Sequence, residues 1–211
     1  MSAAPYSALA AGYDFVMAHV DYDAWAAYLF ELLRRHGTDV ETVVELGGGT
    51  GTLARRLQAL GGYRYVLSDG SAAMLDRARE KLRGEEGAIR CVQADFTALS
   101  RDRLGLEGPA DAVILVYDGL NYLLDEADVT ALLEGVHGLL RPGGLLGIMT
   151  TFQTDDARFA GWHYRRDPTH VVFYRESTLA FIAERMGWTM EIPCANVAIF
   201  RKAPVPATRH A

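Results

Sequence analysis

Short apolar runs alternate with stretches of helical periodicity along most of this chain. Runs of β-branched and other apolar residues are expected to form strands at residues 42–46, 63–68, 88–93, 111–117 and 145–151. Three of these runs are almost continuously apolar, which is typical of strands buried on both faces of a parallel sheet. Two further runs, at residues 188–192 and 197–201, are close enough in sequence to pair as an antiparallel hairpin.

Helices are expected between the strands. In the first of them, apolar residues recur at helical spacing, at Trp25, Tyr28, Leu29, Leu32 and Leu33. Gly37 provides its C-terminal stop, and the RPGG sequence at 141–144 ends a second apolar stripe, which runs from Val129 to Leu140. Ser71 and Ser177 are the expected N-caps of two more helices.

This alternation predicts the α/β class, because strands that alternate with helices form right-handed βαβ units. The expected architecture is a single-domain, doubly wound, mostly parallel seven-stranded sheet. Helices cover both of its faces, and the antiparallel hairpin lies at the C-terminal edge, as in a Rossmann-like fold. The length of 211 residues fits one domain. The tail, residues 203–211, has two prolines and no periodic pattern, so we expect it to be disordered.

Charge and cysteine content narrow the class of partner. The 21 basic and 27 acidic residues give a formal charge of −6, which disfavours nucleic acid or an anionic membrane as the main partner. The two cysteines, Cys91 and Cys194, form neither a disulfide framework nor a metal-binding cluster. No basic residue precedes Arg34, and no apolar run has the length of a membrane span. We therefore expect a soluble, cytoplasmic protein without a bound metal.

A glycine-rich loop directly follows the first expected strand. Gly47, Gly49 and Gly51 form a GxGxG pattern before a helix, where glycine lets a ligand lie against bare main chain at the helix N-terminus. The dinucleotide fingerprint GxGxxG does not fit, because Thr52 occupies its last glycine position. A purely structural turn is the alternative, but four glycines in five positions with Glu45 just upstream disfavour it.

Acids follow the next strands, where an open α/β sheet binds its ligands. Asp69 is placed to bind both hydroxyls of a ribose. Asp95, beside the aromatic ring of Phe96, suits an exocyclic amine and a stacked adenine. A single aspartate at a strand end is more often a turn or helix cap. Because a third acid, Asp118, follows the fourth strand, a ligand site is favoured.

Together these motifs resemble the class I S-adenosylmethionine-dependent methyltransferases. Residues 43–51 (VVELGGGTG) are similar to motif I of that family. Residues 66–71 (VLSDGS), with the Met-Leu pair that follows, resemble its second motif, and residues 91–96 (CVQADF) resemble its adenine-contacting third motif. Residues 139–144 (LLRPGG) match the turn that leads into its fifth strand.

A narrower likeness lies at the flanks of this core. Residues 6–25 resemble the N-terminal lid helix of small-molecule methyltransferases that act on amines and sugars, and residues 118–122 (DGLNY) resemble their D-x-x-N-Y segment. Two departures are Gly48, where relatives carry cysteine or another small residue, and Gly70 after the ribose-binding acid. Neither change removes a group that the family pattern requires.

The resemblance implies which residues would hold S-adenosylmethionine. The expected cofactor-binding residues are Tyr13, Trp25, Glu45, Gly47, Gly49, Gly51, Asp69, Gly70, Met74, Asp95, Phe96 and Asp118. Asp69 would take the ribose hydroxyls, Asp95 would accept from the adenine amine, and Met74 would pack on the adenine. Glu45 would lie near the cofactor's amino group, and the N-terminal aromatic pair would close over the methyl-donor end.

The expected catalytic residues are His170, Asp118 and Asn121. The resemblance places Asp118 and Asn121 near the sulfonium and its methyl group. His170 follows the fifth strand and is proposed as a general base or substrate orienter, with His163 as its substitute. The alternative for His170 is a structural role, in which its ring bonds a backbone carbonyl.

The chain would then consist of N-terminal lid helices (1–36) and a methyltransferase core (37–202), with a substrate-side insertion at 152–174 and the tail already described. The expected activity is in-line transfer of a methyl group to nitrogen or oxygen of a small molecule. The expected oligomeric state is a monomer or a homodimer. Two alternatives stay open at this point: a non-catalytic S-adenosylmethionine sensor or assembly protein on the same fold, and an NAD-dependent oxidoreductase.

Overall fold

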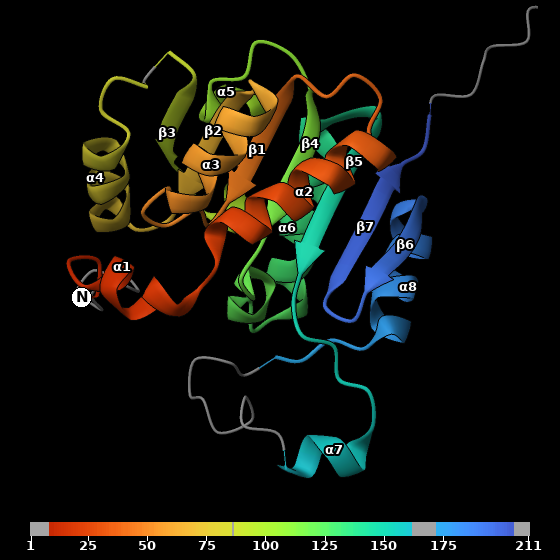
Figure 1. Cartoon of the computed structure of the whole chain (residues 1–211). Coiled ribbons are helices and arrows are strands. Elements are labelled where there is room, and N and C mark those ends of the chain that lie inside the picture. Colours follow the sequence, from red (N-terminus) through yellow and green to blue (C-terminus); the bar gives the residue numbers. More distant parts are fainter. Residues whose placement is uncertain (1–8, 86, 162–171, 205–211) are drawn as a thin grey trace, which may run out of the picture.

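The computed structural model describes residues 9–85, 87–161 and 172–204. Within them lies one sheet of seven strands in the order β3-β2-β1-β4-β5-β7-β6 (Figure 1). The strands are β1 (Thr42–Leu46), β2 (Arg64–Asp69), β3 (Ile89–Gln93), β4 (Ala110–Leu115), β5 (Leu140–Met149), β6 (Trp188–Cys194) and β7 (Val197–Lys202). The first five are parallel, and β7 is antiparallel to both β5 and β6. The predicted fold class and the edge hairpin are confirmed.

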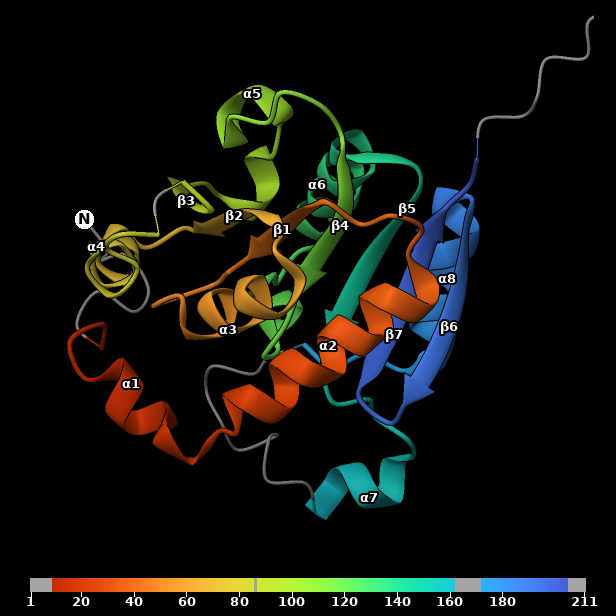
Figure 2. The ribbon, with the colours of Figure 1, turned by 45° about the horizontal axis from the view of Figure 1, so that its top comes forward.

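Helices pack on both faces of the sheet (Figure 2). They are α1 (Tyr13–Val16), α2 (Tyr22–His36), α3 (Thr52–Gly61), α4 (Ala72–Lys81), α5 (Arg101–Leu104), α6 (Glu126–Leu139), α7 (Asp156–Gly161) and α8 (Glu176–Met186). Short 3₁₀ turns are η1 (Met17–His19), η2 (Phe96–Ala98) and η3 (Gly119–Tyr122). The hydrophobic core has two parts: α2, α3 and α4 bury apolar side chains against one face, and α5, α6 and α8 against the other. In Figure 1, α1 and α7 lie beyond the carboxyl ends of the parallel strands.

The helix boundaries confirm one predicted N-cap and correct another. The Ser71 side chain accepts a hydrogen bond from the Met74 N–H at the start of α4, as predicted. Ser177 does not cap α8, which begins at Glu176 with Arg175 as its N-cap. The Arg175 carbonyl already accepts the N–H groups of Thr178 and Leu179, so Ser177 lies in the first helical turn.

The predicted stop at residues 141–144 is also corrected. Helix α6 ends at Leu139, and Leu140 has extended backbone geometry and already pairs with Ala110 as the first residue of β5. The register then shifts between Ala110 and Ala112, so that residues 141–144 form an irregularity within the strand rather than a separate turn. The side chain of Arg141 is held there by an ion pair with Asp111.

None of the described helices is long and apolar enough to cross a membrane. Residues 162–171 lie outside the described part of the chain, and with them the middle of the predicted insertion, including His163 and His170. Most of the predicted tail, residues 205–211, lies outside it as well.

Candidate functional site

The glycine loop joins β1 to α3 at the carboxyl edge of the sheet. Gly47, Gly49 and Gly51 have positive φ angles of 69°, 55° and 76°, a region that side-chain-bearing L-residues rarely adopt. Gly51 is the N-cap residue of α3, so the loop leads directly into the helix N-terminus. The N–H of Gly48 donates to the Ser68 carbonyl (3.0 Å), which fixes the loop against β2.

Two aromatic rings approach this loop at the positions of its missing side chains. The Phe96 ring lies 3.1 Å from where a Cβ on Gly47 would be, and the Tyr13 ring lies 3.7 Å from the same position on Gly49. Burial raises the pKa of Tyr13 to about 12, and the charges of Asp69 and Glu45 contribute to the shift. Tyr13 and Phe96, which the sequence analysis selected from distant segments, are therefore brought together at the glycine loop.

Asp69 ends β2 and faces the same loop. Its Oδ2 accepts a hydrogen bond from the Gly49 N–H (2.9 Å), and its Oδ1 accepts one from the Ser71 N–H (2.8 Å). Burial raises the pKa of this carboxyl, while the two backbone hydrogen bonds act in the opposite direction. A carboxylate has about four lone-pair sites, so each oxygen can accept a further bond.

Asp95 is more exposed than Asp69. It is the N-cap of η2, and its Oδ1 accepts both the N–H and the hydroxyl of Thr97 at 2.8 Å. These hydrogen bonds lower its pKa. Gly70 and Met74 lie between the two acids in sequence. The Gly70 carbonyl accepts from the side chain of Gln93 (3.1 Å), and Met74 is buried in α4.

Glu45, at the end of β1, is buried beneath the loop. The Tyr65 hydroxyl donates to its Oε2 at 2.9 Å, and a Cβ on Gly48 would lie 3.1 Å from its carboxyl carbon. Burial raises the pKa of Glu45 to about 7, against the effect of the Tyr65 bond and with a smaller contribution from Asp69. The sequence analysis did not identify Tyr65 as the partner of this acid.

The N-terminal segment is fixed to the loop by an ion pair. Lys81, at the end of α4, lies 2.7 Å from Asp14 and also donates to the hydroxyls of Thr50 (2.9 Å) and Thr52 (2.5 Å). The Thr50 hydroxyl in turn donates to Asp14 (2.5 Å). We call these contacts of Lys81, Asp14, Thr50 and Thr52 the latch. Because Asp14 follows Tyr13 directly, the latch holds the Tyr13 ring beside Gly49. Sequence reasoning did not predict that these four residues interact, because no motif connects them.

The strand β4 ends two residues earlier than predicted. Tyr117 and Asp118 have positive φ angles of 52° and 59°, which take the chain out of the strand after Val116. Asp118 Oδ1 accepts a hydrogen bond from the Thr151 N–H (3.2 Å), and the Asn121 side-chain oxygen accepts from the hydroxyl of Thr150 (2.9 Å). Both candidate catalytic residues are thus tied to the end of β5.

An aromatic cluster connects this strand end to α2. The Tyr117 ring makes edge contacts with Tyr22 and Trp25, with centroid distances of 5.5 and 6.3 Å. The Arg56 guanidinium lies over the Tyr22 ring at 5.9 Å from its centroid. The predicted lid residue Trp25 therefore packs beside the end of β4.

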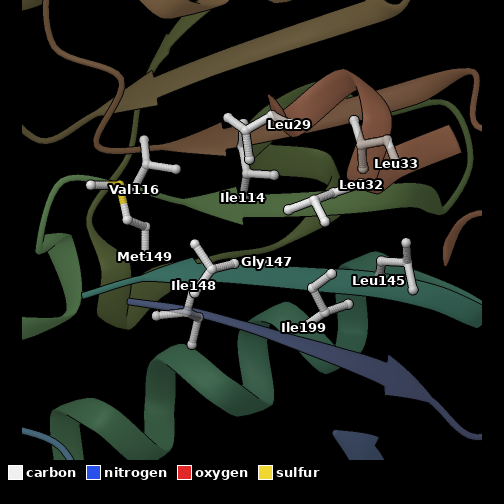
Figure 3. A pocket seen from close by; sticks show the side chains of 11 residues that line it. Leu29, Leu32, Leu33, Ile114, Val116, Leu145, Gly147, Ile148, Met149 and Ile199 are labelled. Atoms are coloured by element: carbon white, nitrogen blue, oxygen red, sulfur yellow. The ribbon is translucent and has the colours of Figure 1, made fainter. Parts of the chain in front are cut away.

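An apolar recess lies apart from these polar groups, between α2 and the sheet (Figure 3). It is lined by Leu29, Leu32, Leu33, Ile114, Val116, Leu145, Gly147, Ile148, Met149, Val197 and Ile199. No residue of the glycine loop borders it, so the candidate site is defined by the polar groups and not by this hollow. Among the described residues, no group of three or more His, Cys, Asp and Glu side chains could hold a metal ion.

The fold and the site define a Rossmann-like α/β protein with a glycine loop after the first strand and acids at the next two strand ends. Residues 43–144 match the family described as a methyltransferase domain. The chain is 32% identical over 155 residues to a putative methyltransferase of Geobacillus sp. (strain WCH70), which covers 71% of this chain and 60% of that protein. The chain thus spans three fifths of this curated relative.

Solved structures agree in fold. An amino pentose methyltransferase from Micromonospora echinaspora, solved with S-adenosylmethionine bound, has a TM-score of 0.69 at 13% identity and covers 91% of this chain and 96% of its own. Streptomyces venezuelae DesVI gives 0.70 at 16% identity, with 94% and 98% covered. The matched methyltransferase domain, the curated relative and the shared fold support a class I S-adenosylmethionine-dependent methyltransferase, the family that the sequence motifs resemble.

Proposed function

We propose that this protein transfers a methyl group from S-adenosylmethionine to nitrogen or oxygen of a small molecule. The observation that carries the proposal is the glycine loop whose Gly49 N–H bonds Asp69, with Asp95 at the next strand end. When bound, the cofactor supplies a methyl group already activated by its positive sulfur. The protein then has to align the acceptor, exclude water and see that the nucleophile loses its proton.

The residues present fit an adenosine-bearing cofactor. Gly47, Gly49 and Gly51 leave the main chain uncovered beside the rings of Tyr13 and Phe96. In the proposal these glycines line the methionine and ribose parts. Asp69 accepts one backbone N–H at each of its oxygens. Each oxygen has a further lone pair, so Asp69 can also accept both ribose hydroxyls. The exposed acid at the end of β3 accepts from the adenine amine, and the adenine packs between side chains from η2 and α4.

The acceptor side of the proposal involves the ends of β4 and β5. Asp118 and Asn121 are buried, and their side chains are hydrogen-bonded to Thr151 and Thr150. In the proposal these fixed side chains orient the reacting groups. His170, which lies outside the described residues, stays a prediction as general base, with His163 as its substitute. If His170 removes the proton, His170→Gln lowers turnover by about a hundredfold or more with S-adenosylhomocysteine affinity unchanged.

A small-molecule acceptor is favoured over nucleic acid. Curated relatives include a glycine/sarcosine N-methyltransferase of Parasynechococcus marenigrum and a tRNA 5-carboxymethoxyuridine methyltransferase of Escherichia coli, each 32% identical to this chain. The net charge of −6 opposes binding to a tRNA backbone and supports the small-molecule class. Two cysteines without a disulfide support a cytoplasmic location. A monomer or homodimer stays the proposed oligomeric state.

The test has two stages. Calorimetry measures binding of S-adenosylmethionine and S-adenosylhomocysteine, expected in the micromolar range at about −8 kcal/mol. Release of S-adenosylhomocysteine is then followed across amines, phenols, sugars and carboxylic acids. A protein that binds neither compound but responds to NAD would contradict the proposal. Binding without turnover on any acceptor class would indicate a sensor instead of an enzyme.

A further inference from the structure

Three buried side-chain polar atoms have no hydrogen-bond partner in the described part of the chain: the hydroxyls of Tyr117 and Tyr174 and the indole nitrogen of Trp188. Burying such a group unpaired costs free energy, so each one needs a reason. Tyr174 and Trp188 belong to the hydrophobic core on the α6 and α8 face. Tyr117 lies at the carboxyl edge, two residues after the end of β4 and directly before Asp118 of the candidate site.

The backbone at Tyr117 is a second, independent sign of function. Tyr117 and Asp118 are consecutive and both have left-handed φ angles, 52° and 59°, although neither is glycine. Strained backbone of this kind persists only where the surrounding structure imposes it, and it is concentrated at ligand sites. Here the left-handed residues lie directly after β4, where the Tyr117 ring packs against Tyr22 and Trp25 of α2.

The surroundings of the ring locate the hydroxyl. Tyr22 and Trp25 contact the ring edge-on and fix its orientation. Burial raises the pKa of Tyr117 far above its usual range, and Tyr22 and Glu45 add to this effect. Tyr13, whose ring lies against Gly49, is also close enough to contribute. The hydroxyl therefore keeps its proton. Tyr117 follows β4, which pairs with β1 on one side, whereas Asp69 and Asp95 follow β2 and β3 on the other side of β1.

We propose that the Tyr117 hydroxyl donates a hydrogen bond to the carboxylate at the amino-acid end of S-adenosylmethionine. A protonated hydroxyl needs an acceptor, and that carboxylate is the strongest acceptor the cofactor carries at this end. The acids at the ends of β2 and β3 are suited to the ribose and the adenine, which leaves the amino-acid end for the β1 and β4 side. This inference rests on the proposed function and adds a contact that none of the sequence motifs contains.

The experiment compares Tyr117→Phe with Trp188→Phe, because each removes a buried, unpartnered polar atom and keeps an aromatic ring, and Trp188 lies in β6, outside the candidate site. Each variant is titrated calorimetrically with S-adenosylhomocysteine and with methylthioadenosine, which lacks the amino-acid end. Tyr117→Phe should weaken S-adenosylhomocysteine about tenfold or more, the effect of a lost hydrogen bond to a charged group. Its affinity for methylthioadenosine should not change, and its ligand-free melting temperature should stay the same or rise.

Trp188→Phe should leave both affinities unchanged. If Tyr117→Phe retains full affinity for S-adenosylhomocysteine, the inference is wrong while the proposed function stands. If both ligands weaken equally, the hydroxyl contacts the adenosine part and the assignment to the carboxylate is overturned. If the unmodified protein binds neither ligand, the proposed function itself fails.

Discussion

Two sides of the candidate site are held together in different ways. On the nucleoside side, formed by Asp69 and Asp95 with the loops that follow them, each acid accepts a hydrogen bond from an N–H two residues further along. On the aromatic side, formed by Tyr13, Tyr22, Trp25, Glu45 and Tyr117, the contacts join α1 and α2 to the ends of β1 and β4. Residues far apart in sequence meet there.

The difference has an electrostatic consequence. Asp95 is exposed and its local hydrogen bonds lower its pKa, so its charge costs little to maintain. Glu45 is fully buried with one partner, and burial raises its pKa to about 7. The nucleoside side therefore presents a charge that is already stabilised, whereas the aromatic side holds acidic groups whose protonated, neutral form is favoured by burial.

The largest expected effect concerns the buried acid. The folded protein holds the Glu45 proton up to a pKa of about 7, whereas an unperturbed glutamate loses it near 4.5. Stability from this group is therefore complete below pH 4.5 and is lost as the pH rises to about 7. The loss amounts to about 3 kcal/mol over that range. Glu45→Gln, which keeps an acceptor for Tyr65, should remove this pH dependence in urea unfolding.

Glu41→Gln is the matched control for this prediction. Glu41 lies at the exposed start of β1 with a side chain that is 71% accessible, and it pairs with Arg64 at the surface. Its substitution should leave the slope of stability against pH unchanged. Equal slopes for the unmodified protein and Glu45→Gln would show that Glu45 is ionised in the folded protein.

The next effect separates the two acids of the nucleoside side. Asp69→Ala removes a carboxylate that is held by Gly49 and should weaken S-adenosylhomocysteine at least about tenfold, because charge-assisted bonds contribute about 1.5–3 kcal/mol each. Asp95→Ala should cost less, about two- to fivefold, since water competes for an exposed acceptor. Calorimetry on both variants measures how much each substitution weakens S-adenosylhomocysteine binding. If Asp95→Ala weakens binding as much as Asp69→Ala, this ranking is wrong.

Most of the nucleoside side could be predicted from the sequence. Its groups lie at strand ends, and the alternation of strands and helices fixes where those ends meet. The glycine loop has its own signature because a positive φ at Gly47, Gly49 and Gly51 requires that residue type. Local caps are equally visible, as at Ser71, although the error at Ser177 shows that a serine near a helix start is no proof of a cap.

The aromatic side could not be predicted in the same way. The sequence gives no sign that Tyr65 pairs with Glu45 or that Lys81 reaches Asp14, because both contacts depend on how helices and strands pack. The early end of β4 is a further example, since Val116 and Tyr117 continue the apolar pattern of the strand. The strand nevertheless ends at Leu115, and the left-handed backbone of Tyr117 and Asp118 follows, which no residue type in this segment predicts.

The smallest expected effect concerns the latch that joins the two sides. Lys81→Met keeps the alkyl chain but removes the charge that binds Asp14, so Tyr13 is held less firmly beside Gly49. S-adenosylhomocysteine affinity should fall up to about fivefold, since a partly exposed ion pair contributes at most about 1 kcal/mol. Raising the salt from about 0.05 M to about 0.5 M should weaken binding by the unmodified protein more than by the variant, because salt screens the pair.

Arg79→Met is the control for the latch, because Arg79 lies on the same helix and pairs at 3.0 Å with Asp76, an acid that makes no contact with the glycine loop. It should leave both the affinity and its salt dependence unchanged. If Lys81→Met behaves like Arg79→Met, the Lys81–Asp14 ion pair does not contribute to cofactor binding. If the two differ as expected, α1 forms part of the binding site, because the charge that fixes it acts on cofactor affinity through the position of Tyr13.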